Sequence, residues 1–394
     1  MLYVLLTYLC WPLLRFSPRR RVAASPRRYL VVQTAKIGDL VYATPLWRAI
    51  KAAHPQAHVT LLAHPAVAPL VACDRALDAI RTVEAGALRG VAGKWRLARQ
   101  VRQGRYDVAL CLTPSLGLAV GLIWGLVPCT VLLVPDVAGM TFRALARLAA
   151  RVRHRRGEPL SAAYGRMAAA VGLAGDMRAR VLAMRPGAKA RVREFLRGRG
   201  VPPGTTLIGI VPGAGNPVKQ WPPDRVAALA DRLAAWPGAR TVFIGAETDR
   251  ALVGAILARM EGPAAARAID AAGAFALPDL PALISGLTLL VAADSGPLHV
   301  AETVGVPAVI VGGPADLRER DLRTTHRLVQ QDLPCLPCVS AFSAPYACPL
   351  GHHRCIVDTE VGEVWAAVRA TLDGVMRTPW IAVQAGSLAI TIDP

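Results

Sequence analysis

One stretch in the second half of the chain constrains the fold most, because it has the pattern of a buried strand, a tight turn and a helix start. Leu287–Val291 is an apolar run suited to a buried parallel strand. Asp294–Gly296 follows it, and Pro297 stands where a helix would begin, with its first-turn φ already set. Such a turn presents free helix N–H groups at the carboxyl edge of a sheet. The stretch therefore predicts a phosphate-binding edge in an α/β domain.

Similar strands alternate with helical stretches along most of the chain. In the first half we expect strands at Arg28–Thr34, His58–Ala63, Ala79–Glu84, Asp107–Thr113 and Thr130–Val134. In the second half we expect further strands at Thr206–Val211 and Arg240–Gly245. Because 394 residues exceed one comfortable core, this alternation predicts two parallel α/β domains. We place them at residues 29–185 and 186–375, with a Pro- and Gly-punctuated linker between them and a tail at 376–394.

Positive charge is concentrated in the first half of the chain. Residues 1–200 hold 32 of the 46 Lys and Arg residues but 9 of the 27 Asp and Glu residues. Such a field attracts nucleic acid, an acidic lipid surface or a phosphorylated acceptor, although charge runs are also often merely solvated faces. With 5% aromatic residues and no stacking motif, nucleic acid is not an expected partner. The densest basic run, Phe142–Arg156, is predicted to be helical and to lie on the side that meets the anionic partner.

Residues 1–28 combine an apolar segment with a cluster of arginines. Met1–Leu14 is nearly all apolar, but it is shorter than the roughly 20 residues of a spanning helix and lacks the marks of a signal peptide. A peripheral or monotopic membrane anchor, with the arginines on anionic headgroups, fits this pattern. The alternative is an extra helix packed on the body of the protein.

The loop after the first strand carries Lys36, Gly38 and Asp39, ahead of a helix expected over Val41–Ala53. Asp39 offers a carboxylate at a strand end, or it is the N-cap of the helix that follows. Lys36 pairs with a phosphate of the acceptor or with Asp39.

A second loop follows Thr206–Val211. Gly213 and Gly215 let the backbone approach a ligand closely, and Lys219 supplies a point charge suited to phosphate. The loop lacks the GxxxxGK[ST] spacing of a Walker A motif, which disfavours a nucleotide hydrolase of that kind.

Three other polar residues stand near predicted strand ends or helix starts. Glu247 and Asp249 could hold ribose hydroxyls, or they cap the next helix. For His299, a packed, hydrogen-bonded residue of the first helical turn is favoured over a catalytic group.

Four cysteines near the end of the second domain, Cys335, Cys338, Cys348 and Cys355, have a CxxC pair followed by a wider pair. Four thiolates at this spacing could hold a structural zinc ion. Reduced structural thiols and a disulfide-capable loop are the alternatives.

Taken together, these motifs resemble glycosyltransferase family 9, the ADP-heptose:lipopolysaccharide heptosyltransferases. The matching pieces span most of residues 29–375 and are Lys36–Asp39 with Pro45, Pro212–Gly215 with Lys219–Pro222, Leu280–Ile284, and Asp294–His299. The resemblance implies a GT-B fold, two Rossmann-like domains facing across a cleft, with the acceptor on the first and the nucleotide sugar on the second.

The same resemblance assigns roles to individual residues. Asp39 is implied to be the general base and Lys219 to contact the donor diphosphate, while Asp294, Ser295 and Gly296 lie at the donor sugar and phosphates. Glu247 or Asp249 would hold the nucleoside. No DxD-like pair stands near these loops, so we expect inverting transfer that needs no metal or other cofactor.

The implied donor is an ADP-sugar, with ADP-heptose favoured. The implied acceptor is an anionic glycolipid of the lipopolysaccharide core or another lipid-linked glycan, at the cytoplasmic face of the inner membrane. Two alternatives stay open: a GT-B nucleotide-sugar epimerase or hydrolase, and a non-catalytic protein that binds anionic glycolipids.

Overall fold

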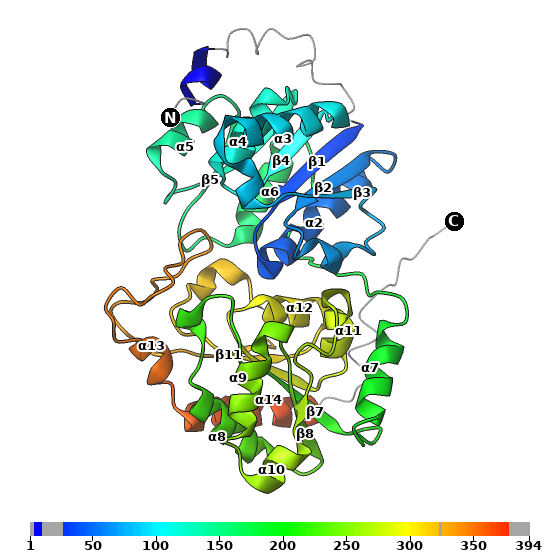
Figure 1. Cartoon of the computed structure of the whole chain (residues 1–394), viewed down its shortest axis with the longest axis vertical. Coiled ribbons are helices and arrows are strands. Elements are labelled where there is room, and N and C mark those ends of the chain that lie inside the picture. The colour runs from blue at the N-terminus through cyan, green and yellow to red at the C-terminus, as the bar shows by residue number, and fades with distance from the viewer. Residues whose placement is uncertain (1–3, 10–26, 323–324, 378–394) are drawn as a thin grey trace.

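Two parallel six-stranded sheets form the framework of the computed structural model, which describes residues 4–9, 27–322 and 325–377 (Figure 1). The first sheet has the strand order β3-β2-β1-β4-β5-β6, and the second has the order β12-β11-β10-β7-β8-β9. In each sheet the first strand in sequence, β1 or β7, lies in the middle, so chain order reverses beside it. Ligands of open α/β sheets bind at the carboxyl ends of strands beside such a switch point.

The elements alternate as the sequence pattern predicts. The first half contains β1 (Arg28–Gln33), α2 (Ile37–Ala53), β2 (His58–Ala63), β3 (Ala79–Thr82), α3 (Gly90–Gly104), β4 (Val108–Cys111), α4 (Leu116–Trp124), β5 (Cys129–Pro135), α5 (Met140–Ala146), β6 (Ala150–His154) and α6 (Leu160–Ala169). The second contains α7 (Ala188–Arg197), β7 (Thr206–Val211), α8 (Pro223–Ala234), β8 (Ala239–Phe243), α9 (Arg250–Leu257), α10 (Gly262–Arg267), β9 (Ile269–Asp270), α11 (Leu280–Ser285), β10 (Leu289–Ala293), α12 (Gly296–Val304), β11 (Ala308–Val311), β12 (Arg327–Val329), α13 (Arg354–Val357) and α14 (Val361–Arg377).

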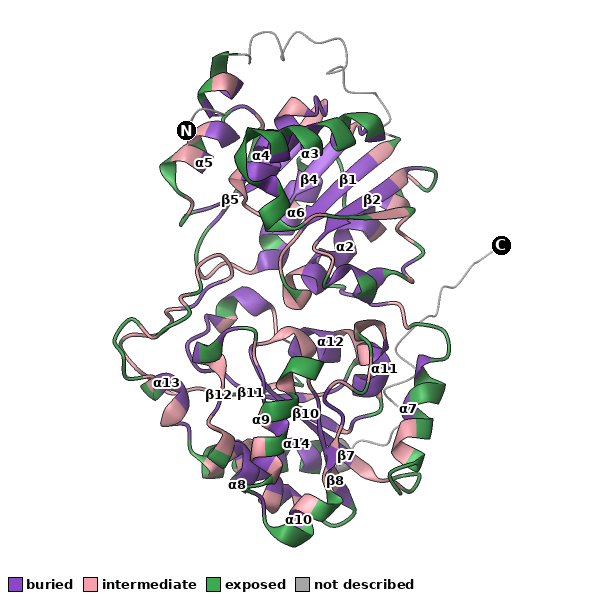
Figure 2. Ribbon diagram, in the orientation of Figure 1, coloured by how far each residue is buried: buried purple, intermediate pink, exposed green. Residues whose placement is uncertain are grey.

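Helices cover both faces of the first sheet, as the buried strands between exposed outer helix faces show in Figure 2. Helices α3, α4 and α5 pack on one face, where Leu97, Leu122 and Leu145 belong to one apolar cluster with the strands. Helices α2 and α6 pack on the other face, and their cluster continues into α12 through Leu298. The two halves of the molecule therefore share a continuous core through α2 and α12, which fixes the site between them.

Two predictions about individual elements are wrong. The helix expected over Val41–Ala53 begins four residues earlier, at Ile37. The run Phe142–Arg156 is not one helix, since α5 ends at Ala146 and β6 follows as the edge strand of the first sheet. Along β6, Val152 and His154 are buried while the arginines between and before them are exposed. This alternation with a period of two is typical of a strand. The sequence reasoning overlooked it because the run is so rich in arginine.

Residues 4–9 form a short helical segment that lies against α4 and α5 (Figure 1). The indole nitrogen of Trp124 donates a hydrogen bond to the Thr7 hydroxyl at 2.8 Å. This part of the predicted anchor thus packs on the body, whereas residues 1–3 and 10–26, like 378–394 of the predicted tail, lie outside the described residues. None of the helices in the described ranges is both long and apolar enough to cross a membrane.

Candidate active site between the two sheets

The amino-terminal ends of α2 and α12 meet where the two sheets face each other. A Cβ atom on Gly38 would lie 2.6 Å from Cδ2 of His299, and one on Gly296 would lie 2.7 Å from Cβ of Ile37. Only glycine permits so close an approach at these two positions. The predicted first-strand loop and the predicted phosphate-binding turn are therefore brought together.

Asp39 sits in the first turn of α2 at this junction. Lys36 occupies the N-cap position, and its backbone N–H donates to the Asp39 carboxylate at 3.3 Å. The carboxylate therefore stabilises the helix start from within the first turn, not as the N-cap. The Lys36 ammonium turns across the junction instead, donating to the carbonyl of Gly215 at 2.8 Å and to the hydroxyl of Tyr346 at 3.4 Å.

The pKa of Asp39 is raised above its ordinary value. Burial of the carboxyl between the two halves of the molecule is the main cause, and the positive charges of Arg320 and His299 nearby lower the pKa partly back. A half-buried carboxylate whose pKa is shifted toward neutrality has the properties of a general base.

Asp294, at the carboxyl end of β10, is surrounded by cationic side chains. Its carboxylate lies 2.6 Å from Nζ of Lys219, 3.3 Å from Nε of Arg320 and 3.5 Å from Nε2 of His299, and the side chain is 2% exposed. Burial alone would raise the pKa of Asp294, but Arg320, His299 and Lys219 hold it well below its ordinary range. The carboxylate is therefore ionised and fixes the Lys219 ammonium at the mouth of the glycine loop.

His299 is packed and paired, as the favoured interpretation holds. Its Nδ1 lies 3.4 Å from Oε2 of Glu302, one helical turn away, and the Tyr42 ring packs edge-on against the imidazole. Burial lowers the pKa of His299, but hydrogen bonding to Asp294 and Glu302 raises it above the ordinary value. His299 thus lies between Asp294 and Glu302 and orients the Asp294 carboxylate.

Arg320 and Glu302 were missed by the sequence reasoning. Arg320 is the last residue of a short 3₁₀ helix, Leu317–Arg320, in the connection between β11 and β12. Glu302 is three residues after His299 on one helix face. Both are buried, and Glu302 also lies 3.5 Å from Arg180. The spacing of Glu302 from His299 was a signal that could have been used, whereas the position of Arg320 in the sequence offers none.

The glycine loop after β7 is packed closely by the side chain of Asp249. A Cβ atom on Gly213 would lie 2.6 Å from Oδ1 of Asp249, whose carboxylate accepts from the N–H of Ala246 at 2.8 Å. Asp249 therefore caps its own turn while packing on the loop. Across the loop, α12 begins at Gly296, and the hydroxyl of Ser295 is buried with no hydrogen-bond partner in the described part of the chain. That hydroxyl and the helix N-terminus are suited to an anionic ligand.

Glu247 lies apart from the ion-pair cluster around Asp294. Its side chain is 70% exposed and forms a surface ion pair with Arg250 at 2.6 Å. Contact of Glu247 with a nucleoside stays a prediction.

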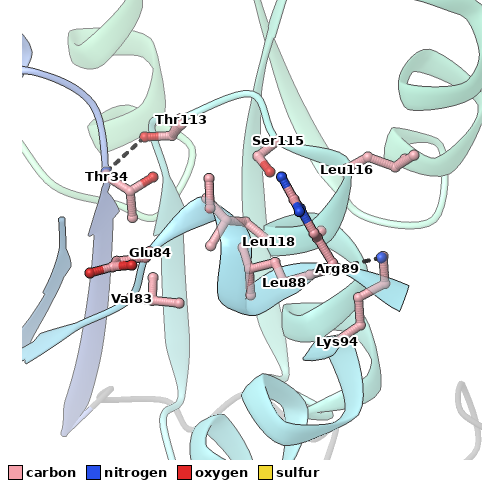
Figure 3. Close-up of a pocket in the computed structure, with 12 residues that line it drawn as sticks. Thr34, Val83, Glu84, Leu88, Arg89, Lys94, Thr113, Ser115, Leu116 and Leu118 are labelled. Atoms are coloured by element: carbon pink, nitrogen blue, oxygen red, sulfur yellow. Dashed lines mark hydrogen bonds between the residues drawn. The ribbon is translucent and has the colours of Figure 1, made fainter. Parts of the chain in front are cut away.

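The first half holds a separate pocket of about 350 Å³, shown in Figure 3. It lies where β1, β3 and β4 end, and its lining includes Thr34, Glu84, Thr113, Ser115 and Arg89. The Thr113 hydroxyl accepts from the N–H of Thr34 at 2.9 Å. The sequence reasoning named none of these residues as a site residue, although it placed Thr34, Glu84 and Thr113 at the ends of predicted strands.

The four cysteines lie in a long segment before and within α13 and form no disulfide. Their thiols are near enough that Cys338 and Cys335 contribute, after burial, to raising the pKa of Cys355 to about 11. Backbone N–H groups lower the pKa of Cys348. Among the residues that the structure describes, however, no three His, Cys, Asp or Glu side chains form a group that could hold a metal. Metal binding by these cysteines stays a prediction.

Two Rossmann-like sheets that share a site at their facing edges define the GT-B class of glycosyltransferase fold, as the sequence analysis predicts. The sequence model of glycosyltransferase family 9 (heptosyltransferase) matches residues 94–344, more than half of the chain. The chain belongs to this family.

Individual relatives support this family assignment. Lipopolysaccharide heptosyltransferase 2 of Salmonella typhimurium (strain LT2) is 29% identical over 308 residues, covering 73% of this chain and 83% of the relative. The structure of a family 9 glycosyl transferase from Veillonella parvula has a TM-score of 0.72 at 21% identity, over 88% of this chain and 98% of that one. E. coli heptosyltransferase WaaC, solved with ADP-2-deoxy-2-fluoro heptose, has a TM-score of 0.58 at 16% identity, over 88% of this chain and 99% of that one. The two structures support the fold alone.

Proposed function

We propose that this glycosyltransferase transfers heptose from ADP-heptose, with inversion at the anomeric carbon, to an anionic lipopolysaccharide-core or other lipid-linked glycan at the cytoplasmic face of the inner membrane. The observation that carries the proposal is the position of Asp39, which faces the Asp294 cluster across the junction of the two sheets. The heptosyltransferase names of the relatives, and the ADP-heptose analogue bound to WaaC, favour this donor.

In the proposed reaction Asp39 accepts the proton of an acceptor hydroxyl. The hydroxyl oxygen forms a bond to the anomeric carbon from one face, and the bond from that carbon to the diphosphate oxygen breaks on the other, so the configuration inverts. ADP leaves with the bonding electrons. Lys219, the Ser295 hydroxyl and the N-terminus of α12 stabilise its negative charge, the role that a metal ion has in other transferases.

The glycine loop would hold the diphosphate, since Gly215 is exposed and has no side chain to cover its backbone. Glu247 or Asp249 would contact the ribose of the nucleoside. The Lys36 ammonium, which is exposed at the junction, would approach the acceptor.

Calorimetric titration with ADP-, UDP-, GDP- and CDP-linked sugars tests the donor. We expect preference for ADP-heptose, weakened in Lys219→Ala. Preference for another nucleotide would overturn the donor but leave the reaction type. Cleavage or epimerisation of the donor that proceeds at full rate without any acceptor would favour the hydrolase or epimerase, and an absence of nucleotide-sugar binding would favour a non-catalytic glycolipid-binding protein.

A further inference from the structure

The helical segment of residues 4–9 is fixed on the first domain by specific contacts. Val4 and Thr7 face the body, and Thr7 is fully buried, with its hydroxyl accepting from Trp124 of α4. The Tyr8 hydroxyl donates to the carbonyl of Ala144 in α5 at 2.7 Å. These contacts set which side of the segment faces outward.

The outward side is apolar, the reverse of a helix in a water-soluble protein. Leu5 is 59% exposed and Leu9 is 67% exposed, one turn apart on the same face as Tyr8. A segment that buries threonine and exposes two leucines has its apolar face turned toward something other than water. Exposed apolar patches of this kind mark interaction surfaces.

The patch continues onto the start of α5. Met140 is 88% exposed, and it lies one helical turn before Ala144, which Tyr8 contacts. Val137, in the turn before α5, is 45% exposed. We call Leu5, Tyr8, Leu9, Val137 and Met140 the apolar rim.

Exposed arginines adjoin the apolar rim. Arg143 is on α5, Arg147 is the C-cap of that helix, and Arg151 and Arg153 are on the exposed side of β6. Between Cys111 and Gly157 the sequence contains one acidic residue, Asp136. A surface that combines an apolar patch with clustered arginines is complementary to a bilayer with anionic headgroups. A second copy of the chain fits less well, because like charges would meet.

We propose that the apolar rim and the arginines of α5 and β6 dock the chain on an anionic phospholipid bilayer. The leucines and Met140 enter the interfacial region, and the arginines contact the headgroup phosphates. The inference does not depend on which sugar the enzyme transfers, so it can fail while the proposed function stands.

Co-sedimentation of the full chain with phospholipid vesicles tests the proposal. We expect binding to vesicles of phosphatidylethanolamine and phosphatidylglycerol, and at least about tenfold weaker partitioning for the double variant Leu5→Glu with Leu9→Glu. Both leucines point outward, so the variant should keep the melting temperature of the parent chain. Leu350→Glu is the matched control, because Leu350 is 63% exposed in the second half of the chain, and it should bind as the parent does.

A second variant tests the charge. Arg147→Glu should weaken binding to these vesicles and reduce its dependence on salt. Equal partitioning of the parent and the Leu5/Leu9 variant would overturn the proposal. So would sedimentation in solution that shows a dimer of the parent and a monomer of the variant, since a second copy would then cover the rim. Transfer to a water-soluble acceptor should be unchanged in both variants, which separates a docking defect from a catalytic one.

Discussion

The two sheets present chemically different carboxyl edges to the junction between them. At the edge of the second sheet, Asp294 is 2% exposed and has Lys219, Arg320 and His299 within 3.5 Å. At the edge of the first, the pocket is lined by the hydroxyls of Thr34, Thr113 and Ser115 together with the charged side chains of Glu84, Arg89 and Lys94. Two sheets of the same topology thus carry one edge of closely paired, buried charges and one edge whose pocket mixes hydroxyls with charged side chains.

The difference indicates how the two substrates would be recognised. A cluster of buried ion pairs is fixed before any ligand arrives, which suits the constant, highly charged diphosphate of a nucleotide sugar. A pocket that combines hydroxyls with a few charged side chains recognises a sugar by shape and by individual hydrogen bonds. Asp39 lies between the two edges and would act on the acceptor hydroxyl next to the bound donor. The predictions below test this division, beginning with the residue on which both edges depend.

Asp39→Asn should give the largest effect. The amide cannot accept the proton of the acceptor, so we expect a fall in kcat of about 10²- to 10⁴-fold, the range typical of a general base. Donor affinity measured by calorimetry should stay within a factor of about two, because the substitution leaves the donor edge intact. Unchanged kcat would contradict the assignment of the base.

Lys219→Ala should act on the donor edge alone. Loss of a charge-assisted contact to the diphosphate is expected to weaken donor binding by about 10- to 100-fold, with little change in the KM of the acceptor. Because Asp294 loses a partner, thermal unfolding should be measured in parallel. Lys219→Arg, which keeps the charge, should recover part of the affinity. An equal loss of affinity for both substrates would argue that the two edges are not separate.

The donor edge was largely predictable from the sequence. Its residues follow strands and stand beside glycines, so Lys219 and Asp294 could be assigned to one sheet edge from local pattern alone. Pairing across the junction could not be predicted in the same way. The contact of Gly38 with His299 joins residues far apart in the chain, and it depends on how two finished domains pack.

Three features that the sequence reasoning did not predict have separate physical causes. Arg320 carries no motif, and its importance comes from burial beside Asp294, a tertiary property. In the pocket of the first half, Thr113 and Ser115 are residue types that are common in loops, so nothing in their type distinguishes them. At β6, the density of arginines led to the prediction of a helix, whereas the alternate burial of Val152 and His154 indicates a strand.

The dependence of transfer on pH tests Arg320. The pKa of Asp39 is raised by burial, so the general base is ionised only at pH values above those usual for an aspartate, and activity should fall as pH falls through that raised pKa. Arg320 lowers this pKa. Arg320→Gln should therefore move the acidic limb of kcat/KM to higher pH, and Arg320→Lys should restore it. His299 and Asp294 also face Asp39 and stay unchanged in both variants. An equal loss of kcat/KM at every pH would mean that Arg320 only stabilises the fold.

The acceptor edge should respond more weakly to substitution. Ser115→Leu fills part of the pocket, and we expect a several-fold rise in the KM of the acceptor, about 3- to 10-fold, with the affinity for the donor unchanged. Ser115→Ala keeps the space and tests the hydroxyl alone, with a smaller effect. If Ser115→Leu leaves the KM of the acceptor unchanged while a bulky acceptor is used, the pocket is not where the acceptor binds.

The smallest effect on catalysis is expected from the cysteine segment. We propose that Cys335, Cys338, Cys348 and Cys355 bind one zinc ion once their thiols close around it, since four thiolates are the ligands of structural zinc. Elemental analysis of the purified chain should find about one zinc per chain, lost in Cys348→Ser and kept in Cys73→Ser, a free thiol outside the segment. Because the segment reaches Lys36 through Tyr346, chelation should raise the KM of the acceptor modestly and leave kcat nearly unchanged. Equal zinc content in both variants would exclude these cysteines as ligands.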